Sequence, residues 1–192
     1  MKIGVLASQG AFAEHTAILQ HLGVEALPVR LPRELVGLDG LIIPGGESTS
    51  ISKLMLDYRL VEETRNLARN GLPIFGTCAG MILLARKVSD LNVEPLGVMN
   101  IMVRRNAFGR QKESFETELT IPVLGKKPFP GVFIRAPLIE EVGSGVEIIA
   151  RLADGTSVAA RQGRLLATAF HPELTDDLRF HQYFLDVATG QR

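Results

Sequence analysis

A single cysteine stands in the sequence Gly76-Thr77-Cys78-Ala79-Gly80, directly after a short apolar run. Residues 73–76 favour a buried strand and residues 79–85 favour a helix. A nucleophile on such a sharp strand-to-helix turn is lifted out of the sheet, and we expect the flanking glycines to permit strained backbone and to leave room for a substrate. A lone cysteine is more often a small buried hydrophobe, but this position at a strand end favours a nucleophile. The helix N-terminus would favour its thiolate, and the Ala79 amide would face a developing oxyanion.

The sequence His171-Pro172-Glu173 follows another apolar run, at residues 165–170. On an extended segment, residues two apart project to the same side, so that Glu173 can reach the imidazole of His171. A cysteine nucleophile needs a base that takes its proton and returns it to the leaving group, and a carboxylate fixes the tautomer of that base. His-x-Glu alone more often marks a surface pair. The motif supports a catalytic role here only because it occurs together with Cys78.

The other histidines fit the role of base less well. His15 and His21 fall on the expected first helix and His181 on the last, where we expect a solvated or packing role. With four histidines and one cysteine in the chain, we expect no metal site and no metal cofactor.

A glycine pair follows the apolar residues 41–43, in the sequence Pro44-Gly45-Gly46-Glu47-Ser48-Thr49. Two glycines at a strand end let backbone amides face a neighbouring ligand, and Ser48 or Thr49 can cap the helix that follows. A plain loop with a helix cap explains the hydroxyl residue without explaining both glycines. The Gly-Lys-Ser/Thr ending of a P-loop is missing, so nucleotide binding has little support.

Arginines gather beside apolar residues at 104–111, and residues 134–137 add the sequence Ile-Arg-Ala-Pro. Arginine next to an apolar wall suits a small carboxylate ligand. Solvated surface charge is the alternative interpretation of these arginines.

Short apolar runs alternate with amphipathic segments in the first half of the chain. We expect strands at 3–7, 26–29, 41–43 and 73–76, and helices at 11–22, 49–56, 60–70 and 79–85. This order implies a parallel sheet with helices on both faces. The second half suggests hairpins with turns at Asp154-Gly155 and Gln162-Gly163, from strands at 115–121, 132–134, 146–152, 156–162 and 165–170, before a helix at 176–188. The pattern predicts a single three-layer α/β domain over residues 1–192, with a mostly parallel central sheet and antiparallel additions in the second half.

The composition restricts the classes of partner. A chain of 192 residues suits one domain, and 21 basic residues balance 21 acidic ones. Zero net charge argues against non-specific binding to nucleic acid or to an anionic membrane. No apolar run approaches the ~20 residues of a membrane span, and the first residues are too briefly apolar for a signal peptide. One cysteine excludes an internal disulfide framework and fits a cytoplasmic location.

Taken together, these motifs resemble the class I glutamine amidotransferases, and more narrowly the family of glutaminase subunits of pyridoxal 5'-phosphate synthase. The strings that carry the resemblance span nearly the whole chain and lie at 9–10, 44–49, 75–80, 105–111, 133–137 and 170–175. The cysteine and histidine strings are shared by the superfamily, whereas those at 105–111 and 133–137 indicate this family. Catalytic positions show no departure from the pattern. Ser8 stands where a larger apolar residue is expected.

The resemblance implies a Cys-His-Glu mechanism without a cofactor. Cys78 would attack the side-chain amide of glutamine, and His171, oriented by Glu173, would protonate the departing ammonia. Water activated by His171 would then release glutamate from the thioester. Backbone amides at Gly46 and Ala79 would form the oxyanion hole, at ~3–4 kcal/mol per donor. The expected glutamine contacts are Gly46, Glu47, Ser48, Arg105, Ile134 and Arg135, and Gln9-Gly10 would lie near the oxyanion and the partner face.

A partner is expected because every segment is used by the glutaminase fold, which leaves no second domain to accept ammonia. The resemblance names that partner as the barrel-shaped synthase subunit, which makes pyridoxal 5'-phosphate from ammonia, a pentose phosphate and a triose phosphate. It would activate a chain that is weakly active alone. Two alternatives stay open: the glutaminase subunit of another pathway, such as imidazole glycerol phosphate or anthranilate synthesis, and a binding or chaperone-like protein in which Cys78 is a redox sensor.

Overall fold

A parallel sheet forms the first half of the molecule, as predicted. The computed structural model describes residues 1–7, 10–89, 92–108 and 113–192. The neighbouring strands lie in the order β2-β1-β3-β4 and all pair in parallel. Their bounds are β1 (Lys2–Leu6), β2 (Glu25–Val29), β3 (Gly40–Ile43) and β4 (Ile74–Thr77). Because parallel strands all end at the same edge, the loops after β3 and β4 lie side by side.

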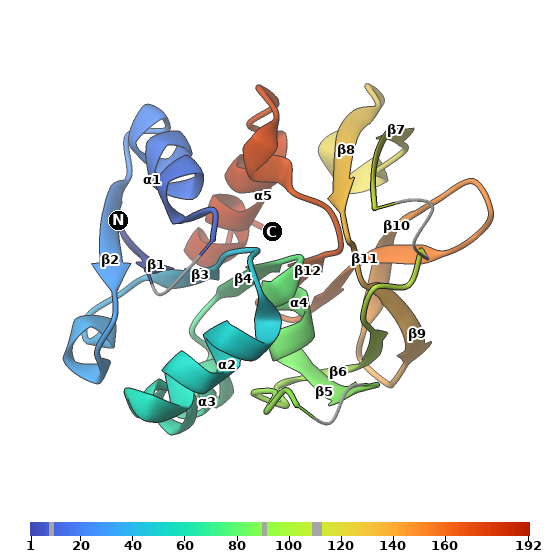
Figure 1. Ribbon diagram of the computed structural model, residues 1–192. Helices are drawn as coiled ribbons and strands as arrows, with labels where there is room; N and C mark the ends of the chain where they lie inside the picture. Colours follow the sequence, from blue (N-terminus) through green and yellow to red (C-terminus); the bar gives the residue numbers. More distant parts are fainter. Residues whose placement is uncertain (8–9, 90–91, 109–112) are drawn as a thin grey trace.

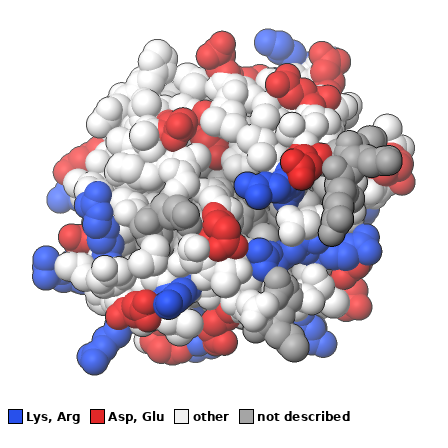
Figure 2. Space-filling model, viewed as in Figure 1, with Lys and Arg blue, Asp and Glu red and all other residues white. Residues whose placement is uncertain are grey.

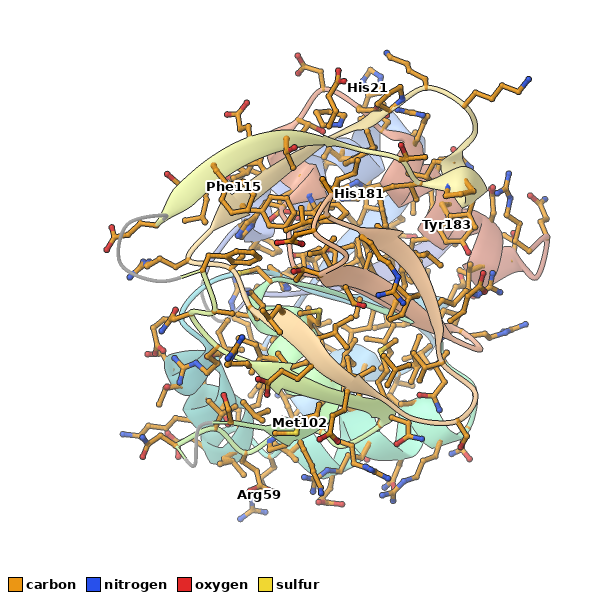
Figure 3. The ribbon with its side chains drawn as sticks, turned by 90° about the vertical axis from the view of Figure 1, so that its right-hand side faces the viewer. His21, Arg59, Met102, Phe115, His181 and Tyr183 are labelled. Carbon is orange, nitrogen blue, oxygen red and sulfur yellow. The ribbon has the colours of Figure 1, made fainter. Side chains whose placement is uncertain are left out.

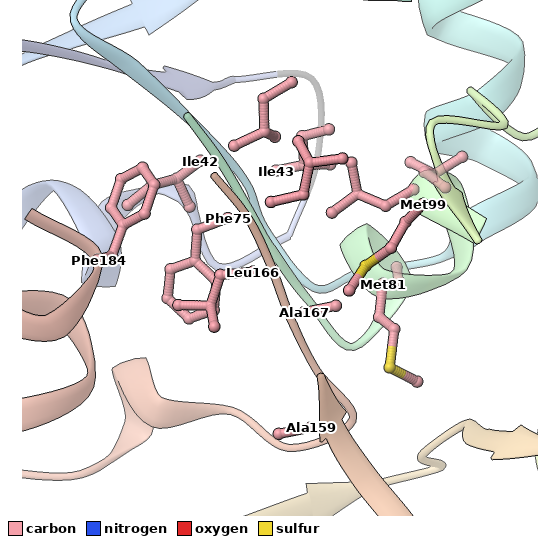
Figure 4. Close-up of a cluster of buried hydrophobic side chains, with 14 of the residues drawn as sticks. Ile42, Ile43, Phe75, Met81, Met99, Ala159, Leu166, Ala167 and Phe184 are labelled. Atoms are coloured by element: carbon pink, nitrogen blue, oxygen red, sulfur yellow. The ribbon is translucent and has the colours of Figure 1, made fainter. Parts of the chain in front are cut away.

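Helices cover both faces of this sheet (Figure 1). One face carries α1 (Phe12–His21) and α5 (Arg179–Thr189), and the other carries α2 (Ser48–Asp57), α3 (Leu60–Arg69) and α4 (Ala79–Leu84). The Phe75 ring on β4 packs against the Phe184 ring on α5, with their centroids 5.6 Å apart. Met81 on α4 lies on the opposite side of the central strands (Figure 4). These layers confirm the predicted α/β class with a mostly parallel core.

The second half extends the sheet and adds a small one. Beyond β4 the order is β12-β11-β9-β6-β5, with β10 paired to β11. The strands are β5 (Ala85–Val88), β6 (Met99–Arg104), β9 (Leu138–Val142), β10 (Glu147–Arg151), β11 (Ser157–Gln162) and β12 (Leu165–Thr168), while β7 (Ser114–Leu119) and β8 (Phe129–Ile134) pair separately. The predicted hairpins β10–β11 and β11–β12 are present, and their turn residues Gly155 and Gly163 have φ of 88° and 58°. Such positive φ values favour glycine.

Three features differ from the sequence prediction. β12 was expected among the antiparallel additions, but it pairs in parallel with β4 and thereby brings the end of the chain into the core. β5, β6 and β9 were not predicted. β9 has a single buried residue, Ile139, so its sequence carries little periodicity. The last helix begins at Arg179, three residues later than predicted, and the Asp177 carboxylate accepts a hydrogen bond from the Arg179 backbone N–H at 3.1 Å.

Short 3₁₀ helices complete the fold, namely η1 (Pro32–Leu35), η2 (Pro122–Leu124) and η3 (Pro172–Leu174). Basic and acidic side chains intermingle over the face shown in Figure 2. Across the described residues, we find no helix with the length and apolar character needed to span a bilayer. Within the same ranges, no group of three or more His, Cys, Asp or Glu side chains is arranged to hold a metal ion.

Candidate active site

Cys78 occupies a strained turn between β4 and α4. Its backbone has φ of 49° and ψ of −100°, a region that side-chain-bearing residues rarely adopt. The Cys78 N–H donates to the Thr168 carbonyl of β12 at 2.7 Å, which fixes the turn against the neighbouring strand. The residue is 7% exposed. Strain held in place by surrounding structure is characteristic of functional sites.

The glycines around the turn act through close packing. Neither Gly76 nor Gly80 has a positive φ, so Cys78 itself carries the strain. A Cβ on Gly76 would lie 2.5 Å from the Gly80 carbonyl oxygen, and a Cβ on Gly80 would lie 2.0 Å from the Ile43 carbonyl oxygen. The glycines therefore allow α4 to pack directly on β3 and β4 around the strained turn.

His171 and Glu173 lie beside this turn because β12 runs parallel to β4. The His171 backbone N–H donates to the Val132 carbonyl of β8 at 2.8 Å. Its side-chain Nδ1 donates to Glu173 Oε1 at 2.7 Å, and Glu173, on η3, is 5% exposed. Burial opposes protonation of the imidazole, but hydrogen bonds and negative charge from Cys78 and Glu173 outweigh it and raise the pKa of His171 to about 10. The side chain is therefore a protonated acid next to the sulfur at neutral pH.

The glycine loop after β3 lies against both side chains. A Cβ on Gly45 would lie 2.3 Å from His171 Cε1 and 3.3 Å from Cys78 Cβ. The Gly45 N–H donates to Thr77 Oγ1 at 3.0 Å, which holds the loop to β4. A Cβ on Gly10 would meet the Gly45 carbonyl oxygen at 1.7 Å, so this approach also requires glycine at position 10. Gln9, expected near the oxyanion, lies outside the described residues.

A pocket of about 520 Å³ opens in front of Cys78 and His171. The six residues expected to contact glutamine all line it: Gly46, Glu47, Ser48, Arg105, Ile134 and Arg135. Residues 109–111, from the arginine-rich string, lie outside the described part of the chain. Ala79 begins α4 and is buried without lining the pocket; Glu173 lies behind His171. Five further residues line the pocket without having been predicted as contacts: Asn106, Phe108 and Ala136, which lie within the strings at 104–111 and 134–137, and Ile82 and Glu113, which lie outside them.

Backbone strain gathers around this pocket. Among the described residues, the non-glycine positions with positive φ are Arg59, Cys78, Asn106 and Arg135, at 59°, 49°, 47° and 41°. All except Arg59 line the pocket. Asparagine adopts positive φ more readily than most residues, so Asn106 carried a weak signal that was not used, whereas nothing in the sequence indicated this strain at Arg135. Its concentration at one pocket supports a functional role for both residues.

Glu47 organises the mouth of the pocket. Its carboxylate accepts hydrogen bonds from the backbone N–H groups of Thr49 at 3.0 Å and Ser50 at 2.7 Å. Glu47 therefore caps α2, and the expectation that Ser48 or Thr49 would be the cap was wrong. Burial opposes ionisation, but these hydrogen bonds lower the pKa of Glu47 to about 2. The anion also holds Arg105, whose Nη2 lies 3.3 Å from Glu47 Oε1.

Comparisons with known proteins identify the family of the chain. A model of the SNO glutamine amidotransferase family matches residues 5–189. A Herpetosiphon aurantiacus protein named pyridoxal 5'-phosphate synthase subunit PdxT is 61% identical over 190 residues, covering 97% of this chain and 100% of that protein. A Pelotomaculum thermopropionicum protein of the same name is 58% identical over 193 residues, covering 100% of this chain and 98% of that protein.

Comparison with solved structures supports the fold described above. A crystal structure described as a glutamine amidotransferase has a TM-score of 0.91 and 51% identity, covering 97% of this chain and 98% of that one. The structure of PurLQS from Thermotoga maritima has a TM-score of 0.70 at 16% identity, covering 96% and 97%, and shares the fold alone. On the family model and these relatives, the chain belongs to the SNO glutamine amidotransferase family.

Proposed function

We propose that this glutamine amidotransferase is the glutaminase subunit of pyridoxal 5'-phosphate synthase, and that Cys78, His171 and Glu173 carry out the hydrolysis. One observation carries the proposal: a strained cysteine and a histidine that is hydrogen-bonded to a buried glutamate lie together at the floor of a pocket of about 520 Å³. The names of the relatives support the pathway over imidazole glycerol phosphate or anthranilate synthesis. The same relatives favour an enzyme over a redox sensor.

The first half of the reaction forms a thioester. The Cys78 thiolate attacks the side-chain carbonyl carbon of glutamine, and a tetrahedral oxyanion forms. Backbone amides at Gly46 and Ala79 would stabilise that oxyanion by ~3–4 kcal/mol per donor. The carbon–nitrogen bond then breaks as the His171 imidazolium gives its proton to the departing ammonia. The high pKa of His171 supports this assignment because the residue holds a proton ready at neutral pH.

The second half regenerates the enzyme. Neutral His171 removes a proton from water, and the resulting hydroxide attacks the thioester carbon. The carbon–sulfur bond breaks, which releases glutamate and returns the Cys78 thiolate next to the His171 imidazolium. The Glu173 carboxylate, hydrogen-bonded to His171 Nδ1, stabilises each imidazolium that forms.

Glutamine binding would use the pocket walls. We assign its contacts to Gly46, Glu47, Ser48, Arg105, Ile134 and Arg135. Arg105 and Arg135 offer guanidinium groups for the α-carboxylate of glutamine, and the Glu47 carboxylate fixes the orientation of Arg105. The Ile134 carbonyl oxygen lies 3.9 Å from Cys78 Sγ, so that a ligand contacting it would have its amide next to the sulfur.

Ammonia produced in this pocket would pass to the barrel-shaped synthase subunit. We treat residues 1–192 as one glutaminase domain, because one continuous apolar core contains residues from both halves of the chain. The acceptor chemistry then belongs to the partner subunit. Docking of that subunit over the pocket would complete the oxyanion hole, so glutamate release should be weak alone and strong in the complex.

The test replaces the nucleophile. Cys78→Ala, assayed with the synthase subunit, should lose glutamate release by at least ~10³-fold, because neither attack nor thioester formation is possible. Pyridoxal 5'-phosphate synthesis from added ammonium salts should persist, since the acceptor site lies on the partner. Wild-type rates with glutamine in this variant would refute the nucleophile assignment. Failure of any synthase subunit of this pathway to bind the chain would refute the pathway assignment.

A further inference from the structure

Two histidines form a buried pair behind the candidate active site. His15 on α1 and His181 on α5 are both fully buried, which rules out the solvated role considered for them from sequence. His15 Nδ1 and His181 Nε2 are 2.8 Å apart, although 166 positions separate the residues in the chain. Figure 3 shows His181 inside the molecule and His21 at its periphery. A buried polar pair of this kind requires a specific arrangement of protons.

The position of each proton follows from an atom without a partner. Among the described residues, His181 Nδ1 is buried and has no hydrogen-bond partner. A proton there would be a buried unsatisfied donor, so the proton of His181 belongs on Nε2, where it is donated to His15 Nδ1. His15 must then carry its own proton on Nε2.

Both rings are neutral. Burial lowers the pKa of His181 to about 4. Burial, followed by the repulsion that protonated His181 and His171 would exert, holds the pKa of His15 well below 6.5. At neutral pH the pair therefore presents one uncharged N–H donor, at His15 Nε2.

That donor faces the back of the triad. His15 Nε2 lies 3.2 Å from Thr77 Oγ1 and 3.4 Å from Glu173 Oε2. Glu173 Oε1 accepts from His171, whereas Glu173 Oε2 has no hydrogen-bond partner within the described residues. The titratable groups that act on His15 are Glu173 and His171, which follow β12, and His181 on α5. Thr77 and the Phe75 ring, both uncharged and on β4, also lie next to it.

We infer that His15 is a positioning residue for glutamine hydrolysis: its neutral Nε2–H, oriented by His181 and hydrogen-bonded to Thr77 Oγ1, makes an attractive contact of 3.4 Å with Glu173 Oε2 that holds the carboxylate so that Oε1 remains on His171. The inference rests on the proposed role of the triad. A protonated His15 would cancel the charge that Glu173 supplies to the His171 imidazolium. A neutral donor holds the carboxylate without cancelling that charge.

The experiment compares kcat and KM for glutamate release across pH, in the complex with the synthase subunit. His15→Leu should lower kcat by roughly tenfold or more, as loss of a group that orients an active-site side chain commonly does. KM for glutamine should stay within about twofold, since His15 lies outside the pocket. The alkaline limb of the kcat profile should move to lower pH, because a less well held Glu173 lets the pKa of His171 fall.

Two further variants separate positioning from packing. His15→Gln keeps an N–H donor near the Nε2 position and should restore both the alkaline limb and most of kcat. His21→Leu, on the exposed side of the same helix, should behave as wild type. Unchanged kcat and pH profile in His15→Leu overturns the inference. A fall in kcat without a shifted limb, or without rescue by glutamine, also overturns it, because packing alone would explain that result.

A measurement on the wild-type chain covers the case in which His15→Leu does not fold. Nitrogen-15 NMR of the histidine rings at pH 7 should show His15 neutral with its proton on Nε2. An imidazolium, or a proton on Nδ1, contradicts the inference. Cys78→Ala is assayed in parallel: glutamate release that survives it refutes the proposed function, whereas Cys78-dependent release unaffected by His15→Leu refutes the positioning role alone.

Discussion

The pocket has two walls that are built differently. The inner wall holds Cys78 and His171, with Glu173 directly behind His171; all three are less than a tenth exposed and follow the ends of β4 and β12. The outer wall holds Arg105, Ile134 and Arg135 from the second half of the chain, and Ile134 is 37% exposed. Backbone hydrogen bonds between strands fix the inner wall, whereas the outer wall places long side chains at the pocket edge. This contrast predicts that inner-wall changes act on kcat and outer-wall changes on KM.

After loss of the nucleophile itself, the largest effect should come from the Glu173 carboxylate behind the inner wall. Glu173→Gln keeps an oxygen that accepts from His171 but removes the charge, so kcat should fall by ~10²–10⁴-fold with KM little changed. Without that charge the pKa of His171 falls. Since the imidazolium exists only below that pKa, the alkaline limb of the kcat profile should move to lower pH.

Glu140→Gln is the matched control, because Glu140 pairs with Arg104 and does not line the pocket. It should leave both constants unchanged. A Glu173→Gln enzyme with wild-type kcat would show that the inner wall and the carboxylate behind it do not govern the chemistry.

An intermediate effect is expected at the glycine that touches the triad. Gly45→Ala would place a Cβ 2.3 Å from His171 Cε1, which forces the imidazole or the loop to move. Displacement of a catalytic group by about 1 Å can cost ~10²-fold, so kcat should fall by about that factor. Steady-state kinetics in the complex measure it, and thermal unfolding together with ammonia-driven synthesis controls for folding. Normal kcat would mean that the close contact has no mechanistic role.

The smallest effect should come from the outer wall. Arg105→Gln removes a charged donor, worth ~1.5–3 kcal/mol in a hydrogen bond to a charged group, so KM for glutamine should rise by roughly tenfold or more. The value of kcat should stay within about twofold. Arg104→Gln is a matched neighbour outside the pocket and should leave both constants unchanged. A fall in kcat at unchanged KM would contradict the division between the walls.

The inner wall could be predicted from sequence because local rules place it. A nucleophile between a buried strand and a helix, and a histidine directly after another buried strand, both lie at strand ends. The proximity of β12 to β4 was not predictable, because β12 follows β11 in a hairpin and periodicity does not indicate its second partner. That parallel pairing is what brings His171 to Cys78.

Two other features left a signal in the sequence that was not used. β6 buries Met99, Ile101 and Val103 alternately, a two-residue period that is visible in the sequence but was not used. The buried His15–His181 pair also left a signal, since His15 is four residues before buried Leu19 and His181 is three before buried Phe184. Helical spacing could have indicated burial, but not that the two rings meet.

The most direct test of the central claim is covalent labelling of the pocket by a chloroketone analogue of glutamine, in the complex with the synthase subunit. Displacement of chloride by the thiolate of Cys78, the single cysteine of the chain, should add one analogue per chain, and peptide mass spectrometry should place it at that residue. Excess glutamine should protect the site, and Cys78→Ala should remain unlabelled. An adduct on another residue, or no adduct in an assembled complex, would contradict the account.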